Sequence, residues 1–198
     1  ISKDIISNIL DKDIDVNEVI TELSSTNLLR MINTDRNNPI FGLHDIYKNE
    51  LLKLSSDKEI IVRELISSLN KIFPDDFKYG NEIHHIFLND QTLAGNIEML
   101  LENTEKYSIK PTYEVLELRL NALINAFELS FMDQAEEHIQ WFKKSFLSYN
   151  IMPKTLGEKQ LFSTFLIHLS ASEFFIYMDT DKALQYLFLA RDIIDNEK

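Results

Sequence analysis

The sequence predicts a mainly α-helical protein with one small β-hairpin near its beginning. Glycine and proline occur four times each among 198 residues, so few positions call for a turn or an unusual backbone conformation. From residue 56 onward, apolar side chains recur at intervals of three and four, which is typical of amphipathic helices. Earlier in the chain, two short apolar runs flank a turn rich in Asn, Asp and Pro, which indicates a hairpin.

Composition and charge exclude several classes of partner. The net charge is −12 and the longest basic grouping is Lys143-Lys144, which argues against nucleic acid, because its phosphates must be neutralised by Lys and Arg. The chain has no cysteine, which excludes disulfides and thiolate metal sites and favours a cytoplasmic location. No apolar run reaches the length of a membrane span, so no membrane partner is expected. The chain lacks an initiator Met, and we interpret it as a fragment of a longer protein.

Residues 1–55 form the first predicted domain, a truncated winged helix. After a first short helix, a second is expected to begin at Asp15, where Glu18 completes a capping-box pattern. The apolar runs 28–32 and 40–43 are expected to pair as the hairpin, and a further helix should follow. Helix, helix, hairpin and helix is the element order of a winged helix that has lost its first helix.

Residues 56–198 form the second predicted domain, an array of helices. Capping-box pairs indicate where two of them begin: Ser56 with Glu59, and Thr155 with Glu158. The helix that starts at Thr155 is apolar on most sides, so we expect it to be central. The expected helices span 56–73, two segments within 80–106 that break near Asn89-Asp90, and then 111–129, 132–149, 155–178 and 181–195.

Two helix pairs, 115–150 and 160–195, resemble tetratricopeptide repeats. Ala135 and Ala183 lie 48 positions apart, whereas the family's period is about 34, so the repeats are degenerate. An ordinary helical bundle with two similar hairpins is the alternative. In either case each pair buries its face only against neighbours, so we expect the array to extend beyond Lys198. The family's small and large positions are matched by Ala135 and Ile139 in the first pair, where Phe142 replaces a small residue, and by Ala171, Ala183, Leu187 and Ala190 in the second.

The triplet Leu43-His44-Asp45 lies where the hairpin should end and the next helix begin. With the run LLRMI before it, it resembles the end of the winged-helix domain in STAND-class (NB-ARC-like) signalling ATPases. In that family a hydrophobic-His-Asp triplet ends the last strand of the wing, and degenerate tetratricopeptide repeats often follow. The resemblance covers the whole chain in its layout and is specific over residues 40–55.

The resemblance implies a role for each polar residue of the triplet. The His44 imidazole would donate a hydrogen bond to the β-phosphate of ADP, and Asp45 would orient the ring or cap the helix. In the alternative interpretation, Asp45 is only a cap and His44 lies at a domain seam. The chain has no G-x-x-x-x-G-K-[ST] loop. ADP or ATP is therefore expected only in the parent protein, bound by an N-terminal nucleotide-binding domain, and this fragment should hold no cofactor by itself.

Other patterns do not support a catalytic, metal or DNA site. The helix that would enter a DNA groove carries Glu18 and Glu22 but no Lys or Arg. His84 and His85 are neighbours on a helix and point about 100° apart, which disfavours one shared metal ion. No nucleophile elbow or distinct carboxylate pair is visible, so we predict a protein that is not an enzyme.

A polar stripe on the helix at 111–129 is the candidate ligand groove. Asn121, Asn125 and Glu128 continue a row that starts with Glu114 and Glu117, and Asn is a mediocre helix former in the middle of a helix. In tetratricopeptide proteins, Asn on the first helix of a pair often binds a ligand's backbone. The alternative is a plain solvated face. Trp141, the single tryptophan, is expected in the core or at a seam.

Together these features predict a non-catalytic regulatory and ligand-sensing fragment of a STAND-type signalling ATPase. The repeats would bind a protein or peptide trigger, and the winged helix would relay that binding to the N-terminal nucleotide-binding domain. The alternative is a free-standing helical-repeat scaffold or peptide-binding protein without an ATPase. An enzyme of unrecognised type is the third possibility.

Overall fold

The protein is mainly α-helical with one small β-hairpin, as the sequence predicts. The computed structural model describes residues 3, 6, 7, 10, 13–26, 29–31, 39, 41–43, 58–74, 80–89, 93–148 and 151–195. The chain divides into two compact units, Ile1–Asp75 with Asn81–Lys110 and Asp76–Gly80 with Pro111–Lys198. This division runs inside the helical array that the sequence predicts as one domain, while the predicted boundary at 55/56 lies outside the described residues. Each unit is described by itself.

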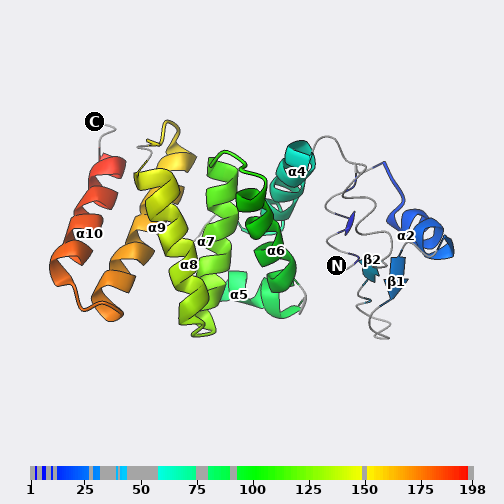
Figure 1. Ribbon diagram of the computed structural model, residues 1–198, viewed down its shortest axis with the longest axis horizontal. Coiled ribbons are helices and arrows are strands. Elements are labelled where there is room, and N and C mark those ends of the chain that lie inside the picture. The colour runs from blue at the N-terminus through cyan, green and yellow to red at the C-terminus, as the bar shows by residue number, and fades with distance from the viewer. Residues whose placement is uncertain are drawn as a thin grey trace. The chain divides into compact units, whose positions relative to one another are not determined.

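The first unit begins with a capped helix and the hairpin. Helix α2 (Val16–Ser25) starts after Asp15, whose carboxylate accepts a hydrogen bond of 2.8 Å from the backbone N–H of Asn17. The predicted start at Asp15 is therefore confirmed, although the bond is to Asn17 and not to Glu18, the predicted capping-box partner. Strands β1 (Leu29–Met31) and β2 (Phe41–Leu43) then pair antiparallel. Figure 1 shows the two strands beside α2. The predicted hairpin is therefore confirmed, and it buries Phe41.

Three helices complete the described part of this unit: α4 (Lys58–Asn70), α5 (Gly80–Asn89) and α6 (Leu93–Lys106). The last two confirm the predicted break near Asn89. The Phe73 and Phe87 rings meet with centroids 5.3 Å apart. Glu59 forms an ion pair with Arg63 at 2.8 Å, while Ser56, its predicted capping partner, lies outside the described residues. The core of these helices contains Val62, Ile66, Leu69, Ile83, Leu93, Ile97 and Leu101.

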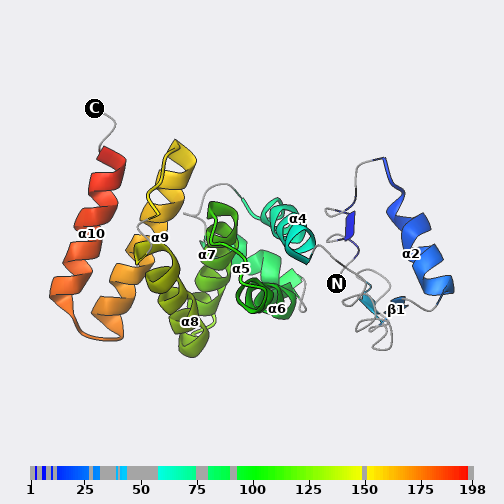
Figure 2. The same ribbon diagram turned by 45° about the horizontal axis from the view of Figure 1, so that its top comes forward.

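The second unit holds α7 (Tyr113–Glu128), α8 (Met132–Phe142), the π-helical turn η1 (Lys143–Leu147), α9 (Leu156–Phe175) and α10 (Thr180–Asp195). Figures 1 and 2 show α9 and α10 side by side along their length. The helix predicted over 132–149 is confirmed, but the sequence analysis did not foresee its change from α to π geometry at residue 143. None of the described helices is both long and apolar enough to cross a membrane.

The ends of α7 and α9 follow from local chemistry. Thr112 caps α7 by accepting from the backbone N–H of Val115, so Pro111 lies just before the helix and not in its first turn. At the start of α9, Thr155 and Glu158 form the predicted capping box, each side chain bonding the other's backbone N–H. This helix ends at Phe175, three residues earlier than predicted, and Met178 beyond it adopts a left-handed φ of 55°.

Aromatic side chains form the centre of the second unit. The Phe142 ring stacks on Phe165 with centroids 4.3 Å apart, and it also contacts Phe146 and Phe162 at 5.9 and 5.2 Å. All four rings are at most 2% exposed. Phe142, which stands where the tetratricopeptide pattern has a small residue, is therefore the residue around which α8 and α9 pack.

Candidate functional site

The triplet that carries the family resemblance begins at the end of the hairpin. Leu43 is the last residue of β2, and it lies opposite Leu29 in the antiparallel pair. His44 and Asp45 follow directly and lie outside the described residues. The second strand of a paired β-hairpin thus ends directly before His44, and the resemblance implies this same order of elements.

Most of the candidate ligand groove on α7 is not exposed to solvent. Asn121 is 0% exposed and Asn125 is 6% exposed, whereas Glu128 at the end of the helix is exposed. The structure therefore does not bring the three residues together on an open surface, and the solvated-face alternative fails for the two asparagines. The physical reason is that α7 is covered around most of its circumference, since every residue from Leu118 to Ala126 is buried.

Asn121 is unusual among the buried polar residues. Both its amide nitrogen and its amide oxygen are buried, and neither has a hydrogen-bond partner among the described residues. Leaving such a group unpaired costs stability. The sequence did not indicate this burial, because the positions one turn before and after Asn121 are the polar residues Glu117 and Asn125.

A buried cation between α7 and α8 was missed by the sequence analysis. Arg119 is 4% exposed, and its guanidinium carbon lies 4.3 Å from the centroid of the Trp141 ring. Its Nη1 atom is 3.5 Å from Nδ1 of the buried His138. Stacking on tryptophan is a favourable setting for a guanidinium. This contact confirms Trp141 as a core residue and gives α7 and α8 a polar connection inside an apolar interface.

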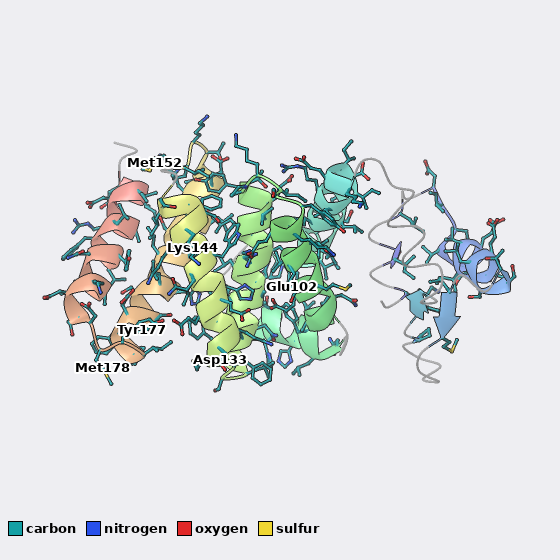
Figure 3. The ribbon with its side chains drawn as sticks, viewed as in Figure 1. Glu102, Asp133, Lys144, Met152, Tyr177 and Met178 are labelled. Carbon is teal, nitrogen blue, oxygen red and sulfur yellow. The ribbon has the colours of Figure 1, made fainter. Side chains whose placement is uncertain are left out.

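A second buried charge connects η1 with the end of α9. The Lys143 Nζ atom lies 2.6 Å from Oε1 of Glu173, a residue that is 3% exposed. The same ammonium stands 5.8 Å from the centroid of the Tyr177 ring. The Tyr177 hydroxyl donates to the Glu136 carboxylate of α8, and this bond raises the pKa of the phenol. Tyr177 and Met178, both labelled in Figure 3, lie where α9 has ended and its connection to α10 begins.

His168 on α9 stacks on Phe127 of α7, with ring centroids 5.7 Å apart and an angle of 18° between the planes. Burial lowers the pKa of its imidazole from 6.5 to about 4. The unfolded chain takes up a proton near pH 6.5, whereas the folded chain does so only near pH 4. Protonation therefore favours unfolding, and the stability contributed by the neutral ring is lost as the pH falls through this window.

We expect the free energy of unfolding to drop by about 2 kcal/mol between pH 7 and pH 4 on account of His168. This is less than the full pKa shift would give, because the ring is only half-buried and water screens its charge. Urea denaturation of the wild type and of His168→Phe at both pH values measures this contribution. The phenylalanine variant keeps a ring against Phe127 but cannot titrate, so its loss on acidification should be smaller by that amount. Equal losses in both proteins would show that His168 does not set the pH dependence.

The histidine pair on α5 and the carboxylates do not form a metal site in the described part of the chain. The His84 and His85 rings have centroids 6.4 Å apart and are tilted by 41°. Among the described residues, no three His, Asp or Glu side chains gather in a way that could hold a metal ion.

Half-exposed apolar residues on α9 and α10 were not predicted. Helix α9, which the sequence predicts to be central, buries most of its apolar residues, but Ile167 and Phe174 are 49% and 47% exposed. On α10, Ala183 and Ala190 are buried, whereas Leu187 and Ile194 are 42% and 46% exposed. Periodicity marked these residues as apolar but gave no sign that a side of each helix is open.

Comparison of the chain with models of protein families, with curated proteins and with solved structures finds no match.

Proposed function

We propose that this chain is a non-catalytic regulatory and ligand-sensing part of a STAND-type signalling ATPase. The observation that carries the proposal is the position of Leu43 at the end of a paired β-hairpin, directly before His44 and Asp45. The helices that follow the hairpin along the chain are compatible with it, since the family places helical repeats after this triplet.

The proposed mechanism has two steps. The helical repeats bind a protein or peptide trigger, and the segment around the hairpin relays that binding to an N-terminal nucleotide-binding domain. There the His44 imidazole donates a hydrogen bond to the β-phosphate of ADP, which stabilises the resting state. The trigger shifts the equilibrium only if it binds the ADP-free or ATP-bound state more tightly than the resting state.

The coding sequence upstream of Ile1 tests the proposal. A strand followed by a G-x-x-x-x-G-K-[ST] loop is expected there, within about two domain lengths. Its absence would contradict the proposal, because no phosphate would then be available to His44.

The second candidate is a free-standing helical-repeat scaffold or peptide-binding protein. The half-exposed apolar residues of α9 and α10 favour it, because they offer a binding surface that needs no nucleotide. An upstream sequence without a phosphate-binding loop, together with peptide binding by this chain, would select this candidate.

A further inference from the structure

We draw no further inference here: the strongest candidate, the half-exposed apolar surface on α9 and α10 that includes Ile167, Phe174, Leu187 and Ile194, carries none because nothing in the structure shows what covers it.

Discussion

Replacing Phe142 with alanine should lower the free energy of unfolding by about 4 kcal/mol. The ring is 0% exposed and stacks on Phe165 at 4.3 Å. Removing it takes away apolar contacts on α8 and α9 at once and leaves a cavity among rings that are held by their own neighbours. Urea denaturation followed by circular dichroism, compared between wild type and variant, measures the loss.

The matched control for this change is Phe175→Ala at the end of α9. Its ring is 73% exposed, so the same truncation should change the free energy of unfolding by less than about 0.5 kcal/mol. If the two variants lost similar stability, the aromatic cluster around Phe142 would not be the centre of the second unit.

The Lys143→Met variant should be destabilised by about 3 kcal/mol. Glu173 is 3% exposed and pairs with Lys143 at 2.6 Å, so removing the ammonium leaves a buried carboxylate without its counter-ion. The long apolar stem of methionine keeps most of the packing of the lysine stem, which separates the loss of charge from the loss of volume. Denaturation at pH 7 gives the change in the free energy of unfolding.

The double variant Lys143→Met with Glu173→Leu should recover most of this loss, to within about 1 kcal/mol of the wild type, because an apolar pair can replace a buried ion pair. Arg191→Met is the matched control, since its pair with Asp192 is 60% and 56% exposed and water screens it. No measurable change is expected there. A double variant as unstable as Lys143→Met would mean that Glu173 is held by something other than the lost charge.

The sequence predicted those elements whose cause is local. The Thr155 capping box, the Asp15 cap and the hairpin between residues 28 and 43 each depend on residues close together in the chain, and all three were found. The break between α5 and α6 was also visible as a polar interruption at Asn89. The π-helical turn at 143–147 was not, and its residues fit an α-helical pattern equally well.

The candidate surfaces were harder to predict because burial depends on neighbours that are distant in sequence. Asn121 and Asn125 are polar, and a polar stripe ordinarily faces water, yet α7 is covered on that side as well. Ile167 and Leu187 are apolar members of amphipathic helices, yet they are 49% and 42% exposed. Periodicity shows which side of a helix differs from the others, but it does not show how many sides are covered.

The rate of ADP release from the full-length protein tests the central claim most directly. In a STAND-type switch, His44→Ala removes a donor to the β-phosphate, and the loss of a hydrogen bond to a charged group should speed ADP dissociation by at least about tenfold. His85→Ala, which removes an exposed histidine of α5, is the control and should leave the rate unchanged. A rate that His44→Ala also leaves unchanged would contradict the account, and the His44-Asp45 pair would then be only the start of a helix.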